Sequence, residues 1–427
     1  MPEKMSRRKL LRKGSEAIVA GGVGAGAAAV AGAVPAIAAV AVPGAPKGVD
    51  YYEKLGVIPF INAAGTYTIL SASIMPEEVR AAIALAAKKP VHLLELHEAA
   101  GNYLAKKLRC GGALVTSGAS AGLTLGTAAC ITMGNKDAIV SIPTDLSGLK
   151  NEVIVQKAHR YEYDHAMRNC GVKVIEVETV EQYQNAFTEK TAMTNFFNAQ
   201  DAPISREEWV RVAHQHGVPC FNDAAADVPP ISNLWNYTQM GFDLVAFSGG
   251  KGMRGPQCTG LLLGRKDLID AARLNNSPNS NAVGRGLKVS KEDIIGMVAA
   301  VDWFMSQDDA AMEAEFRKRA ERIAEQVRKV PTVETTVFIP PVANHVPHLL
   351  VTYDPARVRA TGVEVMHKMR EGKPRIELNP GSGGAPASAG LPGGENTIIV
   401  GVWMLEPGED LIVGHRLREV LLNAAHP

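Results

Sequence analysis

The chain has 427 residues, of which 46% are hydrophobic and 21% are charged, and these proportions exclude a wholly disordered polymer. Lys and Arg number 45 against 44 Asp and Glu, so the chain lacks the basic field that binds a nucleic acid backbone. Five widely spaced cysteines form no CxxC pair for zinc, and their odd number argues against a complete disulfide framework: Cys110, Cys130, Cys170, Cys220 and Cys258. We expect a globular α/β enzyme of two or three domains, without a metal.

The first 46 residues differ in composition from the rest of the chain. Arg7 and Arg8 begin a basic stretch, and residues 17–46 are uncharged and rich in Ala, Gly and Val. This stretch is too weakly apolar for a stable membrane-spanning helix, and 39–41 supplies an A-x-A cleavage site. The paired arginines resemble a twin-arginine signal, although Leu10 stands where Phe is usual. We predict a signal peptide over 1–46 that is read by the twin-arginine export machinery, and a periplasmic or exported protein. An uncleaved membrane anchor and a cytoplasmic protein with a disordered tail are the alternatives.

Strand and helix patterns alternate from residue 50 onward. Helices are expected over 76–89, 93–108, 123–133 and 206–216, and strands over 58–62, 113–116, 138–141, 172–176, 192–196, 218–221 and 244–247. Because this alternation requires crossover connections, it indicates a mostly parallel sheet. We therefore predict a large α/β domain over 50–300, with a polar loop at 274–290.

A second group of apolar strands follows a long amphipathic helix that is expected over 292–330. The strands are expected at 337–339, 349–351, 375–378 and 397–402. They predict a smaller α+β domain over 301–427. Residues 381–394 include six glycines and are expected to form a mobile loop.

Ligands of doubly wound sheets bind beyond the carboxyl ends of the strands, so residues that follow strands are the most informative. Residues 116–122, Thr-Ser-Gly-Ala-Ser-Ala-Gly, join a strand to a helix. Small residues there let backbone amides approach an anion, and Ser117 and Ser120 add hydroxyl donors. The alternative is an ordinary strand–helix turn capped by serine. The segment is neither a Walker A loop nor a GxGxxG fingerprint.

Two further strands lead to Asp223 and Lys251. A carboxylate at a strand end can keep a cationic ring nitrogen protonated, whereas the alternative is an Asp that caps the next turn. Lys251 is surrounded by glycines, which a solvated surface lysine does not need. A buried lysine forms Schiff bases with aldehyde cofactors, and Ser248 can reach a phosphate at the same edge.

A phosphate turn, an acidic residue and then Ser-x-x-Lys occur in the order found in fold-type I PLP enzymes. Residues 61–66, 116–122, 157–165 and 247–260 resemble the selenocysteine synthase (L-seryl-tRNA(Sec) selenium transferase) family, and more narrowly its small-molecule relatives such as D-glucosaminate-6-phosphate ammonia-lyase. The resemblance covers about 50–425. It implies an aminotransferase-like fold, pyridoxal 5'-phosphate as the cofactor, and a homodimer or higher even oligomer.

The resemblance also assigns roles to residues. Lys251 matches the Schiff-base lysine, and Asp223 matches the carboxylate under the pyridine nitrogen. The positions that bind the phosphate match Ser117, Gly118, Ala119, Ser120 and Ser248. His165 or His159 falls where a group that stacks on the ring or contacts the substrate is expected, although a lone histidine is more often structural.

Basic residues elsewhere are candidates for substrate contacts. Arg285, Lys288 and Lys291 match the basic loop of the family and could contact an anionic group across a dimer interface, the alternative being a solvated charge run. Arg375 begins a strand of the smaller domain and is a candidate for the substrate carboxylate, since a guanidinium binds carboxylates bidentately.

These assignments predict a PLP-dependent lyase of the ammonia-lyase or dehydratase type. It would catalyse α,β-elimination on a hydroxylated amino acid or amino-sugar acid, with Lys251 as the base and Asp223 keeping the ring nitrogen protonated. The alternatives are β-replacement of the L-seryl-tRNA(Sec) selenium transferase type or the reaction of another PLP transferase, and a non-catalytic relative that binds a ligand or partner. The neutral charge argues against tRNA as a substrate, and no nucleic acid partner is expected.

Overall fold

The computed structural model describes residues 49–198, 202–384 and 391–425. The predicted signal peptide, and part of the loop predicted at 381–394, lie outside the described residues. Met1–Val57 and Ile58–Pro427 form separate units, and the described part of the first contains the short helix α2 (Tyr51–Leu55), which Asp50 caps. Among the described residues, no helix combines the length and the apolar character that crossing a membrane requires.

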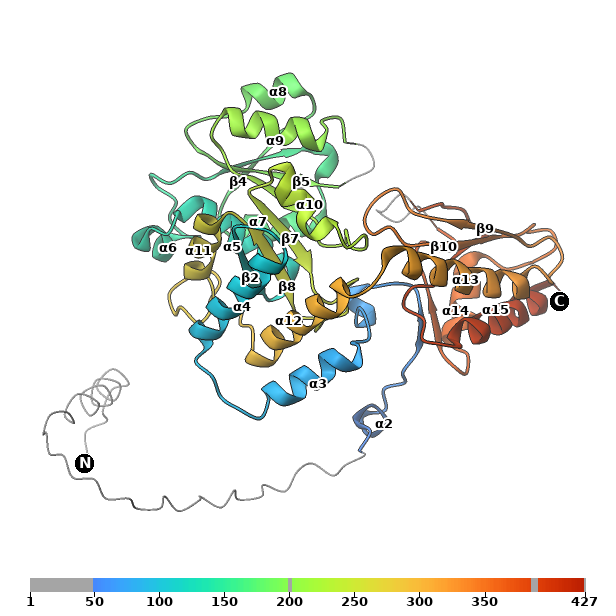
Figure 1. Cartoon of the computed structure of the whole chain (residues 1–427). Helices are drawn as coiled ribbons and strands as arrows, with labels where there is room; N and C mark the ends of the chain where they lie inside the picture. Colours follow the sequence, from blue (N-terminus) through green and yellow to red (C-terminus); the bar gives the residue numbers. More distant parts are fainter. Residues whose placement is uncertain (1–48, 199–201, 385–390, 426–427) are drawn as a thin grey trace, which may run out of the picture. The chain divides into compact units, whose positions relative to one another are not determined.

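A seven-stranded sheet lies at the centre of the N-terminal part of the second unit (Figure 1). Its order is β2-β8-β7-β6-β5-β3-β4. Strands β3 to β7 pair in parallel, and β8 runs antiparallel to both of its neighbours. The predicted α/β fold with a mostly parallel sheet is therefore confirmed. The strands are β2 (Gly112–Thr116), β3 (Glu152–Gln156), β4 (Lys173–Val177), β5 (Thr191–Phe197), β6 (Cys220–Asp223), β7 (Leu244–Ser248) and β8 (Gly260–Gly264).

Helices cover both faces of this sheet, which explains why its strands are apolar on both sides. One face packs on α5 (Gly118–Thr132), α7 (His165–Arg168) and α11 (Lys266–Asn275). The other face packs on helices from several regions: α3 (Glu77–Ala86), α4 (Leu93–Lys107), α8 (Val180–Asn185), α9 (Arg206–Gln215), α10 (Asn233–Met240) and α12 (Lys291–Met305).

Some predicted elements are wrong. Residues 138–141, predicted as a strand, lie in helix α6 (Lys136–Ser141), because the Asn135 side chain accepts hydrogen bonds from two amides of its first turn. The helix predicted over 292–330 is two helices, α12 and α13 (Asp309–Val327), and Asp308 caps the second. Strands β3 and β8 were not predicted, and α5 begins at Gly118 rather than at residue 123.

The C-terminal part contains a three-stranded antiparallel sheet, β12-β10-β9, with helices packed against it. Strand β1 (Ile61–Ala63) pairs in parallel with β11 (Ile376–Leu378), so a strand from the N-terminal region completes this apolar core. The division into domains near residue 300 remains a prediction. The other elements are β9 (Glu334–Phe338), β10 (His348–Thr352), β12 (Thr397–Gly401), α14 (Gly362–Arg370) and α15 (Glu409–Ala425).

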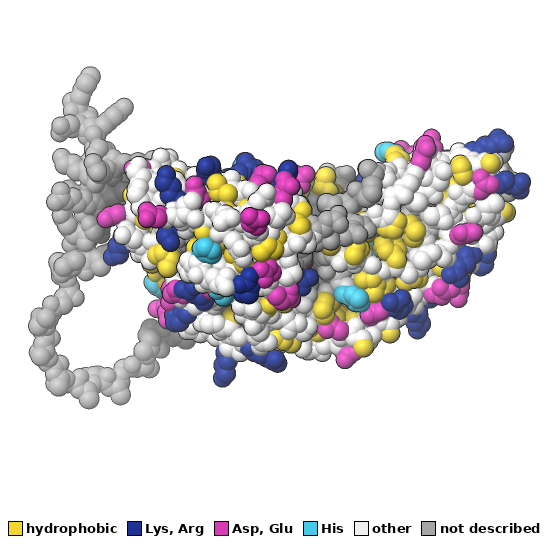
Figure 2. Space-filling model, turned by 90° about the horizontal axis from the view of Figure 1, so that it is seen from above, with side chains coloured by type: hydrophobic (Ala, Val, Ile, Leu, Met, Phe, Trp, Pro, Cys, Tyr) yellow, Lys and Arg dark blue, Asp and Glu magenta, His cyan; other side chains and the backbone are white. Residues whose placement is uncertain are grey.

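The surface carries both signs of charge. On the face that Figure 2 shows, Lys and Arg side chains are interspersed with Asp and Glu side chains. This mixture matches the near balance of 45 basic and 44 acidic residues. On this face, recognition of an anionic ligand would therefore depend on individual side chains rather than on a broad positive field.

Candidate active site

The three segments singled out in the sequence meet at one edge of the sheet. The turn at 116–122 follows β2, Asp223 ends β6, and Lys251 follows β7. These strands run in the same direction, because β6 and β7 pair in parallel and β2 and β7 are both antiparallel to β8. The amide of Ser248, at the end of β7, donates to the carbonyl of Ala225 at 3.2 Å and joins two of the segments.

Asp223 is a fixed carboxylate. Its side chain is buried, Oδ1 accepts from the Ala225 amide at 3.1 Å, and Oδ2 accepts from the Tyr161 hydroxyl. Burial raises the pKa of Asp223, while the two hydrogen bonds and the charge of Lys251 act in the opposite direction. A buried carboxylate held from two sides has a defined orientation, as a partner of a ring nitrogen requires.

Lys251 lies on a turn closed by backbone hydrogen bonds, with the Gly249 amide donating to Thr259 at 2.8 Å and the Gly255 amide to Gly249 at 2.8 Å. Glycine is required at position 252, since a Cβ there would stand 2.2 Å from the Val228 carbonyl oxygen. Burial lowers the pKa of Lys251, and the charges of Asp223 and Asp227 oppose this shift. A lowered pKa increases the fraction of neutral amine, which is the nucleophilic and basic form.

The turn after β2 is open to an anion. Gly118 has φ +84°, and nothing lies within 4 Å of a Cβ built on it. Ser117 precedes the 15-residue helix α5 without making a capping hydrogen bond. Gly260 lets β8 approach this turn, because a Cβ there would stand 2.5 Å from the Gly118 carbonyl carbon. The amino end of α5, which also carries Ala119 and Ser120, thus offers free donors to a phosphate.

Asp227 is a second buried carboxylate near Lys251 and was not assigned a role from the sequence. Its Oδ2 accepts from the Tyr237 hydroxyl at 3.0 Å and from Asn198 Nδ2. Burial raises the pKa of Asp227 to about 6, the charge of Asp223 adds to this rise, and Arg206 opposes it. The two carboxylates beside the lysine therefore differ in their environments, as acid and base groups of one site commonly do.

Replacement of Asp227 by Asn is expected to stabilise the protein above pH 6. The carboxyl pKa is 3.8 in the unfolded chain and about 6 in the fold, so its contribution to stability is full below pH 3.8 and lost as the pH rises through 6. The difference corresponds to at most about 3 kcal/mol. Melting temperatures of Asp227→Asn and wild type should differ most at pH 8 and converge as the pH falls to 3.8. A difference independent of pH, or one equal to that of the exposed control Asp354→Asn, would contradict this expectation.

The aromatic group at Asp223 is Tyr161, which the sequence did not reveal. Tyr161 stacks on Phe197, with ring centroids 4.3 Å apart and planes at 9°. His159 is buried beside Phe196, its Nδ1 accepts from the Phe197 amide at 3.2 Å, and burial lowers its pKa to about 4. His165 is exposed at the start of α7, and in the described part of the chain no hydrogen bond or ring contact joins it to Asp223 or Lys251. The structure thus places Tyr161, rather than either histidine, at the carboxylate.

The basic loop lies away from the phosphate turn of its own chain. Gly284, which precedes Arg285 in the basic loop, donates its amide hydrogen to the Asn275 carbonyl, and Asn275 Nδ2 donates to Thr132 at the carboxyl end of α5. The phosphate turn lies at the other end of this helix, which begins at Gly118. A helix of 15 residues is about 22 Å long. Arg285 therefore does not reach the turn within one chain, which leaves the contact across a dimer interface as the remaining prediction. The neighbouring Lys288 is exposed, and Lys291 pairs with Glu292.

Arg375 lies at the amino end of β11. Its carbonyl accepts from the Ile61 amide at 2.9 Å, while Asn379 at the other end of the strand donates to Ala64 and to the Tyr67 hydroxyl, each at 3.1 Å. The carboxyl end of β11, rather than its beginning, therefore meets the segment that follows β1.

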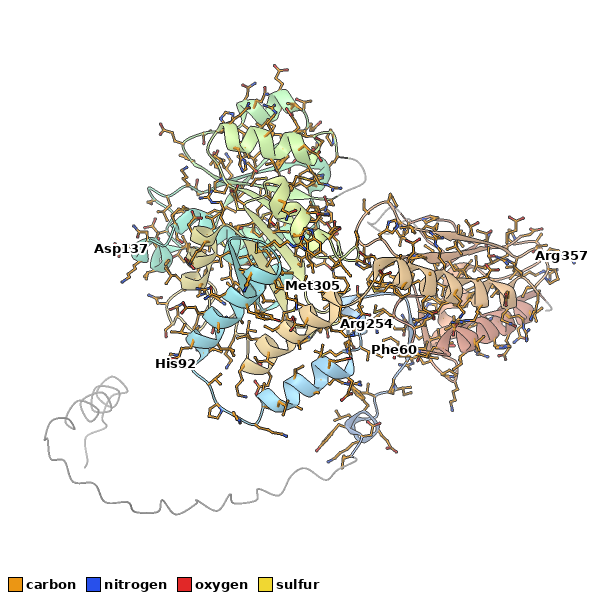
Figure 3. All side chains as sticks on the ribbon, in the orientation of Figure 1. Phe60, His92, Asp137, Arg254, Met305 and Arg357 are labelled. Atoms are coloured by element: carbon orange, nitrogen blue, oxygen red, sulfur yellow. The ribbon has the colours of Figure 1, made fainter. Side chains whose placement is uncertain are left out.

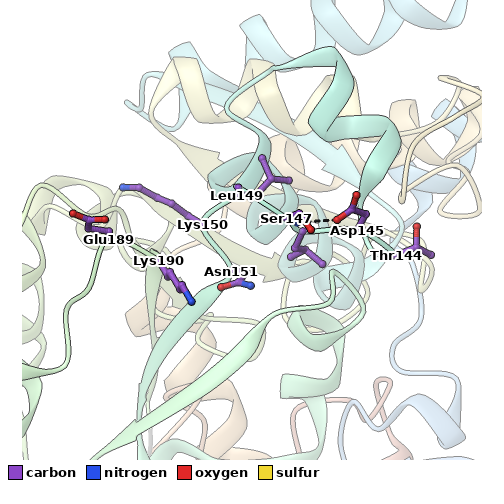
Figure 4. Close-up of a pocket in the computed structure, with 10 residues that line it drawn as sticks. Thr144, Asp145, Ser147, Leu149, Lys150, Asn151, Glu189 and Lys190 are labelled. Carbon is purple, nitrogen blue, oxygen red and sulfur yellow. Dashed lines mark hydrogen bonds between the residues drawn. The ribbon is translucent and has the colours of Figure 1, made fainter.

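The hollow drawn in Figure 4 is separate from this site. It is lined by residues 144–151 with Glu189 and Lys190, which precede β3 and β5. The amides of Asn151 and Glu152 both donate to the Lys190 carbonyl at 2.9 Å. This hollow thus belongs to the amino-terminal edge of the sheet, whereas Asp223 ends a strand at the opposite edge.

Comparison with known proteins identifies the family. Residues 114–350 match the model of the aminotransferase class-V family. The chain belongs to this family. The D-glucosaminate-6-phosphate ammonia lyase of Salmonella typhimurium (strain 14028s / SGSC 2262) is 31% identical over 288 residues, which cover 64% of this chain and 75% of that protein. The 5'-C-glycyluridine monooxygenase-decarboxylase of Streptomyces sp is 28% identical over 342 residues, which cover 77% of this chain and 83% of that protein.

The fold comparison agrees with the family. A solved structure of D-glucosaminate-6-phosphate ammonia-lyase matches with a TM-score of 0.75 and 26% identity, covering 88% of this chain and 100% of that one. The L-seryl-tRNA(Sec) selenium transferase of Rhizobium meliloti (strain 1021) is 28% identical over 235 residues, about half of each chain. The predicted fold type and the resemblance to these proteins are confirmed.

Pyridoxal 5'-phosphate is the cofactor of this class-V enzyme, and its residues fit that group. The donors at the start of α5 suit the phosphate, the buried carboxylate of Asp223 suits the pyridine nitrogen, and the amine of the half-buried Lys251, whose pKa is lowered, suits the aldehyde. The individual roles of these residues remain predictions, which the mutations below test.

Proposed function

We propose that the protein is a PLP-dependent lyase that catalyses α,β-elimination on a hydroxylated amino acid or amino-sugar acid. The observation that carries the proposal is a lysine of lowered pKa beside two buried carboxylates at the carboxyl edge of the sheet. The similarity to an ammonia lyase over three quarters of that protein's length supports the type of reaction.

Each residue has a defined task in this proposal. PLP, when bound, draws in the negative charge that develops at the substrate α-carbon. Lys251 Nζ accepts the α-proton, because burial keeps part of its amine neutral. Asp223 holds the proton of the pyridine nitrogen, and Ser117, Ser120 and Ser248 donate to the phosphate. Loss of the α-proton and of the β-hydroxyl as water leaves an enamine, which water hydrolyses to a 2-keto acid and ammonia.

Release of 2-keto acid and ammonia in equal amounts is the test of this function. Hydroxylated D- and L-amino acids and D-glucosaminate 6-phosphate would be supplied to the holoenzyme, and both products measured. Equal release from one of them is the expected result. If a substrate is consumed only when a nucleophile is added, the reaction is β-replacement. If none of the supplied substrates is turned over, the result favours a non-catalytic relative.

We also propose that the enzyme is an even-numbered oligomer. Independently of this, we propose that it is exported by the twin-arginine route. Replacing both Arg7 and Arg8 with Lys keeps the formal charge, yet should leave unprocessed protein in the cytoplasm, because the pair itself is read by a receptor. The wild type should appear outside the inner membrane with its N-terminus near Val42 or Pro46. Fractionation with N-terminal sequencing measures both, and a full-length cytoplasmic wild type would contradict the proposal.

A further inference from the structure

Arg254 lies on the same turn as Lys251, three residues further along the chain. Figure 3 shows it at the junction between the part with the seven-stranded sheet and the C-terminal part. Its side chain is only 19% exposed, and Nη2 donates to the Trp403 carbonyl at 2.9 Å. Nη1 is 3.5 Å from the Glu406 carboxylate, longer than an ordinary hydrogen bond. The anchored guanidinium therefore keeps donors available.

The backbone at Arg254 is strained. Its φ is +52°, in the left-handed region that non-glycine residues seldom adopt. Such strain is retained where the surrounding structure or a function requires the side chain, since glycine would take this conformation without cost. The position thus favours a specific use of the guanidinium.

Two more unused donors lie close to Gly65. The Trp403 side chain is 5% exposed, and its Nε1 has no hydrogen-bond partner among the described residues. A Cβ on Gly65 would stand 3.7 Å from this nitrogen and 3.5 Å from the Tyr67 ring. The Tyr67 hydroxyl accepts from Asn379, which leaves its own hydrogen free to donate. An unpaired buried N–H is costly, and an acceptor from a ligand would remove that cost.

The segment that carries Gly65 and Tyr67 is tied to the lysine turn. Ser73 Oγ donates to the Gly250 carbonyl at 2.6 Å, and Gln257 Nε2 donates to the Thr68 carbonyl at 2.9 Å. Asn62 shapes the segment, since its Oδ1 accepts from the amides of Ala64 and Gly65 at 3.1 and 3.0 Å. Arg254 is therefore bonded to the Trp403 backbone, the Trp403 indole lies near Gly65, and the segment of Gly65 and Tyr67 is bonded to the turn that carries Lys251.

We propose that Arg254, with the indole N–H of Trp403 and the hydroxyl of Tyr67, binds the carboxylate of the amino acid substrate. A guanidinium, an indole N–H and a hydroxyl hydrogen are all donors, and a carboxylate needs two or three of them. Glu406, which is 42% exposed, turns to solvent when the substrate carboxylate takes its place. In this proposal Arg254 takes the role for which Arg375, at the amino end of β11, was the candidate from the sequence. The inference rests on the proposed function in one respect, namely that the substrate is an amino acid.

The test compares L- and D-serine with serinol, in which a hydroxymethyl group replaces the carboxylate. Each would be titrated into the holoenzyme, with binding followed by the visible absorbance of PLP. The wild type should bind a serine enantiomer more tightly than serinol, and R254M should lose about tenfold to a hundredfold of this preference. R254K should lose part of it, because lysine keeps the charge without the fork.

Two controls separate binding from folding. R254G removes the strained φ together with the side chain and its bond to the Trp403 carbonyl, so a cooperative melt would show that it still folds, and it should lose the preference for serine. W403F keeps an aromatic ring and should lose the preference several-fold, even if R254M does not bind PLP. No preference in the wild type, or the full preference in R254G, would overturn the inference. A preference with no keto acid released would instead contradict only the lyase function.

Discussion

Replacing Lys251 with Ala is expected to abolish both the visible absorbance of covalently bound PLP and all turnover. The turn after β7 places Lys251 at the carboxyl edge of the sheet, and burial lowers the pKa of its amine. Without it, neither the covalent attachment nor the base for the α-proton remains. Spectra and keto acid release would be measured on the same preparation.

The matched control is Lys173→Ala, which removes an exposed lysine at the start of β4. It should leave the spectrum and the rate at wild-type values. A Lys251→Ala protein that still holds reducible, covalent PLP on another lysine would refute the assignment of Lys251.

Asp223→Asn should still bind PLP but lose roughly 10² or more in rate, because the ring nitrogen is no longer held protonated. Asparagine has nearly the same shape; its Oδ1 can still accept from the Ala225 amide, and its Nδ2 can donate to the Tyr161 hydroxyl, which reverses the direction of that bond. The loss should therefore appear in kcat, with little change in the PLP dissociation constant. Near-normal turnover would mean that Asp227 or another group performs this task, and Asp227→Asn measured in parallel would distinguish the two.

The alternation of apolar strands and helices was sufficient to predict the sheet, but not every element. The run 138–141 is apolar enough for a strand and short enough to be ambiguous, and the Asn135 cap decides for helix α6. Strand β8 follows the lysine turn without a crossover helix and runs antiparallel, so the βα pattern could not indicate it. Local signals therefore determine most of the fold, and pairing between distant segments determines the rest.

The site was predicted where function depends on a position directly after a strand, as for Asp223 and Lys251. It was missed where the partners are distant in sequence. Tyr161 reaches Asp223 across 62 positions, and Arg254 reaches Trp403 across 149. Nothing in the local pattern around Tyr161 or Trp403 shows such a contact, since only the packed chain brings these groups together.

Reduction of the purified holoenzyme with borohydride, followed by peptide mapping, tests the central claim most directly. The reagent fixes PLP permanently to the lysine that carries it, whatever the substrate is. One modified peptide is expected, containing Lys251 within Ser248–Arg254. PLP fixed on a different lysine, or a protein that retains no PLP to reduce, would contradict the proposed active site.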